Sequence, residues 1–146
     1  MREKCLVLIK PDGISRGLMP LILQRIKEAG LVILEQKFIT ATEDQCRQHH
    51  NIKTRNYGAT EEQIVDYLAR SYVNKGNICV MVVEGERAVE KSYEIKVSVR
   101  DSFCIDTPEK CKAECRALHN VMHSSENLSD AEKEIEVWLR DGKSFL

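Results

Sequence analysis

The sequence contains no long apolar run and no cysteine pair of the CxxC type. No segment approaches the roughly 18 apolar residues that would suggest a membrane span. The first apolar run is short and ends in Lys-Pro-Asp-Gly, which is unlike the layout of a secretory signal. We therefore expect the six cysteines to be free thiols rather than a disulfide framework. Together these absences predict a soluble protein of the cytoplasm.

A strong charge of either sign is also missing. The chain has 22 Lys and Arg against 23 Asp and Glu, a formal net charge of −1. Because this balance gives no general attraction to nucleic acid or to an anionic membrane, we expect neither as a partner. A site for phosphate must then be a local cluster of positive side chains. What the sequence does have is 42% hydrophobic residues, enough for the core of one domain over residues 1–146.

Four short apolar runs are typical of β-strands, and the segments between them have helical spacing. The runs are bounded by glycine, proline or polar turn residues. Three segments have the Ser/Thr-x-x-Gln/Glu pattern of a capping box, which marks the start of a helix. The predicted strands are 5–10, 31–41, 78–85 and 101–106; the predicted helices are 15–30, 43–50, 61–73, 86–95, 108–118 and 130–140; the capping boxes begin at Thr42, Thr60 and Ser129.

The order of these elements predicts the fold class. Without the two helices between the second and third strands, the order is βαββαβ, which is the ferredoxin-like arrangement. This α/β (α+β) fold has a four-stranded antiparallel sheet covered by helices, which we expect on one face. The fold alone says little about function.

Two basic residues are candidates for phosphate contact, although each has an ordinary alternative. Lys10 stands at a strand end before Pro-Asp-Gly, where its ammonium could meet a phosphate, but such turns are common and a solvated lysine is the simpler interpretation. Arg100 suits bidentate contact with phosphate. A lone arginine is nevertheless usually a surface residue.

His123 is a candidate nucleophile. A histidine that attacks needs one ring nitrogen exposed without a proton, and a partner that holds the proton on the other nitrogen. Glu134, eleven residues later in a predicted helix, could be this partner, and the Ser125 hydroxyl could orient its carboxylate. An ordinary loop histidine is the alternative, and no local feature decides between them.

A metal site is a further possibility. Cys111, Cys115, His119 and His123 are spaced by four and would form a stripe on one continuous helix, which could bind zinc. Because 120–125 has the composition of a loop, we expect the stripe to break before His123. A charged helix with two thiols is the simpler interpretation, and we predict no metal held by protein ligands alone.

Taken together, the segments resemble the nucleoside diphosphate kinase family. Five of them match motifs of that family and occur in the family's order, from about residue 4 to residue 140. One such match would be weak, whereas five in register are strong. The matching segments are LVLIKPDGISRGL, MVVEGERAV, SVRDSF, NVMHSSE and AEKEIEVWL.

The resemblance implies that a γ-phosphoryl group passes from a nucleoside triphosphate to a nucleoside diphosphate through a phosphohistidine. His123 matches the nucleophile, and Glu134 and Ser125 match the residues that hold its ring. Mg²⁺ would arrive bound to the phosphates rather than in a protein cage. Ping-pong kinetics, weak base selectivity and a homo-oligomer built from dimers are also implied. The residues that match groups around the phosphates and the ribose are Lys10, Arg100 and Asn120.

The chain departs from the family pattern around the nucleotide. His50 stands where the family usually has a tyrosine, Tyr57 falls near the base-stacking aromatic, and Tyr93 aligns with a phosphate-binding arginine. We include all three among the predicted nucleotide-binding residues. The long loop that relatives carry is reduced to 96–98, while 107–118 resembles an insertion.

The tyrosine in place of an arginine leaves the expected phosphate site one positive charge short. One charge-assisted contact contributes about 1.5–3 kcal/mol, or a factor of about 10 to 150 in binding. We expect Lys110, Lys112 or Arg116 of the inserted segment to supply the missing charge. The alternative function is a nucleotide-binding or regulatory module of the same fold with weak or no kinase activity.

Overall fold

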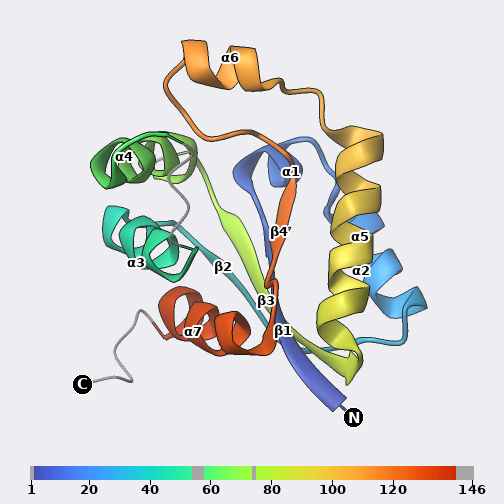
Figure 1. Cartoon of the computed structure of the whole chain (residues 1–146). Coiled ribbons are helices and arrows are strands. Elements are labelled where there is room, and N and C mark those ends of the chain that lie inside the picture. Colours follow the sequence, from blue (N-terminus) through green and yellow to red (C-terminus); the bar gives the residue numbers. More distant parts are fainter. Residues whose placement is uncertain (1, 54–57, 74, 141–146) are drawn as a thin grey trace.

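The centre of the molecule is a four-stranded antiparallel sheet (Figure 1). The computed structural model describes residues 2–53, 58–73 and 75–140. Its strands are β1 (Arg2–Ile9), β2 (Val32–Ile39), β3 (Ile78–Glu86) and β4 (Met122–Ser124). They lie in the order β2-β3-β1-β4, with every neighbouring pair antiparallel. This order is that of the predicted ferredoxin-like fold, so the fold class is confirmed.

Helices cover both faces of this sheet, and the expectation of one covered face is wrong. The helices are α1 (Pro11–Ser15), α2 (Met19–Glu28), α3 (Glu43–Lys53), α4 (Glu61–Tyr72), α5 (Ala88–Phe103), α6 (Pro108–Ala113) and α7 (Leu128–Leu139). In Figure 1, α2 and α5 lie on one side of the sheet and α3, α4 and α7 on the other. Alternate side chains of β1 accordingly enter two separate cores, with Val7 and Ile9 in one and Leu6 and Leu8 in the other. A strand buried on both faces is a continuous apolar run, as this one is.

The predicted strand at 101–106 is wrong. These residues include the end of α5, which extends from Ala88 to Phe103, and the fourth strand is the three-residue β4. Ile95, Val99 and Phe103 pack against the core at intervals of four, and this helical period outweighs the short apolar run that suggested a strand. Arg100 therefore lies in the last turn of a helix rather than before a strand.

Two helix starts are confirmed and one is wrong. Thr42 and Thr60 each accept the backbone N–H three residues on, and the glutamine there returns a hydrogen bond to the backbone of the threonine. In α7 the cap is Asn127, whose side chain accepts the N–H of Asp130 at 2.7 Å, so the predicted box at Ser129 does not form. The predicted helix 15–30 begins at Met19.

The segment predicted as an inserted helix is helical only in part. α6 ends at Ala113, and Cys115 takes a left-handed φ of 54°, which an α-helix does not accommodate. The chain then runs back along α4, where the N–H of Ala117 donates to the carbonyl of Tyr67 at 3.1 Å. The Arg116 guanidinium pairs with Asp106 at 2.6 Å. The insertion thus contacts α4 and the loop that follows α5.

Two expectations about composition can be checked directly. All six cysteines are free, as predicted. Within the described ranges, no helix combines the length and the apolar character that crossing a bilayer would require.

Candidate active site

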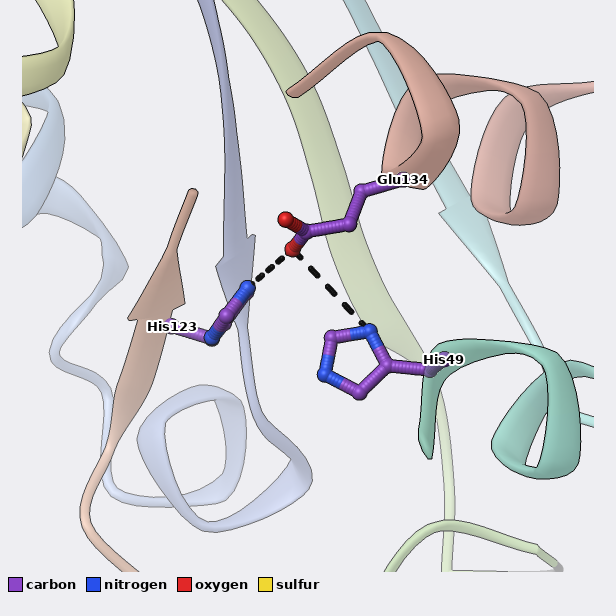
Figure 2. A group of neighbouring side chains, drawn as sticks. All are labelled: His49, His123 and Glu134. Atoms are coloured by element: carbon purple, nitrogen blue, oxygen red, sulfur yellow. Dashed lines mark hydrogen bonds and ion pairs between the residues drawn. The ribbon is translucent and has the colours of Figure 1, made fainter. Parts of the chain in front are cut away.

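His123 and Glu134 meet beside the end of the central sheet (Figure 2). His123 lies on β4 opposite Leu8 of β1, and Glu134 projects from α7 with no exposed surface. Nε2 of His123 hydrogen-bonds Oε1 of Glu134, whereas Nδ1 has no hydrogen-bond partner among the described residues. A carboxylate only accepts, so the ring proton is on Nε2 and the lone pair is on Nδ1. Nδ1 is therefore the nitrogen available for attack.

The surroundings keep the His123 ring neutral. Burial lowers the pKa of His123 well below its ordinary value, and four nearby cations lower it further. A histidine nucleophile must be unprotonated on the attacking nitrogen, so this shift favours reactivity near neutral pH. The four cations are Lys53, Lys10, Lys96 and Arg100.

Glu134 is fixed by neighbours on several elements. The Ser125 hydroxyl accepts the backbone N–H of Leu6 at 3.3 Å and hydrogen-bonds Glu134. Lys53 on α3 places its ammonium 3.4 Å from Oε2. Burial raises the pKa of Glu134, whereas His49, Lys53 and Ser125 lower it. These contacts hold one carboxylate oxygen toward His123 and the other toward Lys53.

His49 is part of the site, although the sequence analysis missed it. Its ring meets that of His123 edge-on, with centroids 4.8 Å apart, and its Nδ1 lies 4.0 Å from Oε1 of Glu134 (Figure 2). The same Nδ1 accepts the indole N–H of Trp138 at 3.1 Å. Burial lowers the pKa of His49 to about 3, so this ring is neutral and supports His123 by packing. Only the tertiary contact between α3 and β4 reveals it.

Three side chains of the site lie close enough together to be considered as metal ligands. Ligand atoms of His49, His123 and Glu134 lie within 4.8 Å of one another. The ammonium of Lys53 nevertheless lies against the carboxylate, and a dication there would be repelled by this charge. The four-spaced stripe of cysteines and histidines does not form, because α6 ends before Cys115.

A pocket of about 250 Å³ opens in front of His123. It lies between α3, α4, α5 and the segment leading into β4. Three of its side chains are basic and converge from two helices, whereas its one acidic residue within the described ranges is Glu126. The lining consists of His49, His50, Lys53, Ile64, Leu68, Lys96, Arg100, Asn120, His123 and Glu126.

The Lys-Pro-Asp-Gly segment, predicted as a turn after the strand, forms the first turn of α1 instead and is built into this site. The Lys10 ammonium donates to the Asn120 side-chain carbonyl. Val121 takes a φ of 76°, which is strained for a β-branched residue, and is held there because its N–H donates to Asp12 at 3.0 Å. A Cβ on Gly13 would lie 2.8 Å from the Val121 carbonyl, so this turn requires glycine. The turn therefore fixes where the chain enters β4.

Two cations from α5 reach the pocket. Arg100 donates through Nε and Nη2 to the Met122 carbonyl at 3.2 and 2.8 Å, which holds its guanidinium beside β4. Lys96, one turn earlier, is only 6% exposed and was not predicted. Its spacing of four from Arg100 was the available signal, because such residues share one helix face.

The predicted site residues divide into three groups. The structure brings together the catalytic set and most of the nucleotide set: His123, Glu134, Ser125, Lys10, His50, Arg100 and Asn120. Tyr93 is 52% exposed and does not line the pocket, and Tyr57 lies outside the described residues. None of Lys110, Lys112 and Arg116 lines the pocket either.

Fold and site together define a class of protein, one with a ferredoxin-like fold and a buried histidine–glutamate pair beside a pocket that three basic side chains line. Comparison with known proteins agrees: the model of the family "Nucleoside diphosphate kinase" matches residues 3–144. The chain belongs to this family, and it is a nucleoside diphosphate kinase, a nucleotide-binding phosphotransferase.

The similarity to relatives and to solved structures extends along nearly the whole chain. The nucleoside diphosphate kinase of Pyrobaculum aerophilum is 29% identical over 95% of this chain and 96% of its own length. Nucleoside diphosphate kinase A2 of Xenopus laevis is 30% identical over 96% of this chain and 86% of its own length. The fold resembles a Borrelia burgdorferi enzyme solved with bound vanadate and ADP, with a TM-score of 0.78 at 24% identity, covering 97% of this chain and 89% of that one.

Proposed function

We propose that the protein passes the γ-phosphoryl group of a nucleoside triphosphate to a nucleoside diphosphate through a phosphohistidine on Nδ1 of His123. One observation carries this proposal. Glu134 engages Nε2 of His123 and leaves Nδ1 beside a pocket lined by cations. The alternative of a binding module without catalysis is not favoured, since the nucleophile and its carboxylate are both present.

The first half of the reaction forms one bond and breaks one. Nδ1 of His123 attacks the γ-phosphorus, the bond to the β–γ bridging oxygen breaks, and the nucleoside diphosphate leaves with that electron pair. Nε2 keeps its proton, and Glu134 stabilises the positive charge that the phosphorylated ring gains. Lys10 and Arg100 would stabilise the equatorial oxygens. A second nucleoside diphosphate then takes the phosphoryl group by the reverse of these steps.

Mg²⁺ is the cofactor that we propose, carried by the nucleotide. Bound to the phosphates, it neutralises charge that builds up during transfer. The donor set of the pocket fits this role, because three basic side chains line it and Glu126 is the one carboxylate there among the described residues. A hard cation that keeps its waters needs no protein cage.

Intact-protein mass spectrometry tests the proposed function. The protein is mixed with ATP and Mg²⁺, and the mass should rise by one phosphoryl group. Addition of GDP or CDP should remove the group and yield the matching triphosphate, whereas EDTA added at the start should prevent the gain. Tight ADP binding without any gain in mass would favour the binding module instead.

Burial lowers the pKa of Lys10 to about 7, and the charge of Arg100 adds to the shift. In the free protein at pH 8, most Lys10 is thus neutral, and a bound phosphate would favour the charged form. We expect ADP binding at pH 8 to take up a proton that the variant Lys10→Gln does not take up. At pH 6 Lys10 is already charged, and this difference should vanish.

Calorimetry in two buffers of different ionisation enthalpy measures this uptake. Subtracting the Lys10→Gln result from the wild-type result removes the contribution of the nucleotide's own titration. Equal uptake by the two proteins at pH 8 would show that Lys10 does not change charge when ADP binds.

The edge strand β2 supports a homo-oligomer built from dimers. β2 pairs only with β3 among the described strands, and Val32, Leu34 and Phe38 on it are 45–52% exposed. An exposed apolar edge strand favours association. Phe38→Glu should therefore shift sedimentation velocity from dimer to monomer, whereas Ile105→Glu, at a more exposed position away from β2, should not. A wild-type monomer at micromolar concentration would contradict the dimer.

We also propose that the protein works in the cytoplasm. Six free cysteines suit a reducing compartment. Cell fractionation tests this, and recovery of the protein only in an oxidising compartment or a membrane fraction would contradict it.

A further inference from the structure

Lys96 is a buried cation in the active-site pocket. It is 6% exposed and contributes to the pocket lining beside His123. Among the described residues, no carboxylate pairs with its ammonium within ion-pair distance. Its nearest described aromatic contact is the Tyr93 ring, with Nζ 4.9 Å from the centroid.

A buried ammonium without a counter-ion destabilises the folded protein, because the charge loses its hydration and gains no ion pair. Burial lowers the pKa of Lys96 most, the charges of Arg100 and Lys53 lower it further, and Glu126 and Cys5 raise it. A buried cation normally has a charged partner. A ligand anion in the pocket would supply one, and a phosphate group of a nucleotide is such an anion.

We propose that Lys96 binds a phosphate group of the nucleotide and that Tyr93 positions Lys96 for this contact. The proposal rests on the proposed function, because it names a further substrate-binding residue for the same reaction. It accounts for the tyrosine that stands where relatives have a phosphate-binding arginine. The positive charge is regained three residues later on the same helix face, and the exposed ring holds the lysine by a cation–π contact.

Other cations near the site fit this role less well. The Lys53 ammonium lies 3.4 Å from both Asp130 and Glu134, so its charge is already paired with these two carboxylates. The basic residues of the inserted segment do not line the pocket, and Arg116 pairs with Asp106 and Glu114. Lys96 therefore supplies the replacement charge that the sequence analysis expected from the insertion.

Replacement of Lys96 tests the proposal by direct binding. Lys96→Met should weaken binding of Mg-ADP by about 10- to 100-fold. It should weaken binding of pyrophosphate, which lacks base and ribose, by the same factor, and Lys96→Arg should recover most of the loss. The matched control is Lys91→Met, on the same helix but away from the pocket, which should bind as the wild type does. Binding by Lys96→Met within twofold of the wild type would overturn the proposal.

Variants of Tyr93 test whether its ring positions Lys96 or contacts the nucleotide directly. Tyr93→Leu removes the ring and should weaken ADP binding about 3- to 10-fold, whereas Tyr93→Phe keeps the ring and should recover that affinity. In a protein that already carries Lys96→Met, adding Tyr93→Leu should not weaken ADP binding any further. An equal loss in both backgrounds, or no recovery with Phe, would overturn the positioning role.

Binding measurements also keep the two proposals distinguishable. Failure of the wild type to form a phosphohistidine would count against the proposed function and would leave the ADP and pyrophosphate titrations interpretable. Normal phosphohistidine formation with unchanged titrations in Lys96→Met would count against the role of Lys96 alone.

Discussion

His123→Ala should lower phosphoryl transfer by about 10⁴-fold or more, because the reaction then has no nucleophile. The expected mass gain with ATP and Mg²⁺ should disappear. The variant should still bind ADP, since Lys10, Lys96 and Arg100 remain. Loss of turnover together with retained binding would assign His123 to the chemical step.

Two further measurements make this prediction specific. Free imidazole should enter the space left by the missing ring and restore part of the turnover of His123→Ala. His119→Ala, in the same segment but outside the pocket lining, should turn over at the wild-type rate. Transfer by His123→Ala at a rate near that of the wild type would mean that another residue is the nucleophile.

Glu134→Gln should lower turnover by about 10²- to 10⁴-fold, although the side chain keeps its size. One carboxylate oxygen faces His123 and the other faces Lys53. The ammonium of Lys53 can only donate, so the amide oxygen must face Lys53 and the amide NH₂ must face His123. Nε2 would then have to accept, which moves the ring proton to Nδ1. The nucleophilic nitrogen is blocked while the shape of the site is preserved.

Nitrogen-15 NMR of the His123 ring measures this tautomer directly. The wild type should have its proton on Nε2, and Glu134→Gln should have it on Nδ1. Adding Lys53→Met removes the donor that orients the amide, so the double variant should regain the Nε2–H tautomer and turn over about 10-fold faster than Glu134→Gln alone. A double variant that is no faster, or an unchanged tautomer in Glu134→Gln, would contradict this account.

The fold was largely readable because its signals are local. The β1 run, the capping boxes at Thr42 and Thr60, and the glycine and proline turns depend on residues adjacent in sequence. β4 was missed because it has three residues and forms only against the end of β1. The helix–strand error at 101–106 has a related cause, since the core contact of Phe103 depends on the packing of the whole of α5.

The sequence by itself determined the family, the order of the strands and helices up to α5, and the central pair of His123 and Glu134. Those features are carried by motifs whose spacing is visible along the chain. Only the tertiary structure decided which ring nitrogen of His123 is free and that His49 packs against His123. It also placed Lys96 in the pocket and left the basic residues of the insertion outside it, which is the basis for the proposal that Lys96 supplies the replacement charge. These features depend on which side chains of different helices and strands meet, and on which face of a helix lines the pocket. Spacing along the sequence alone fixes neither of these two arrangements.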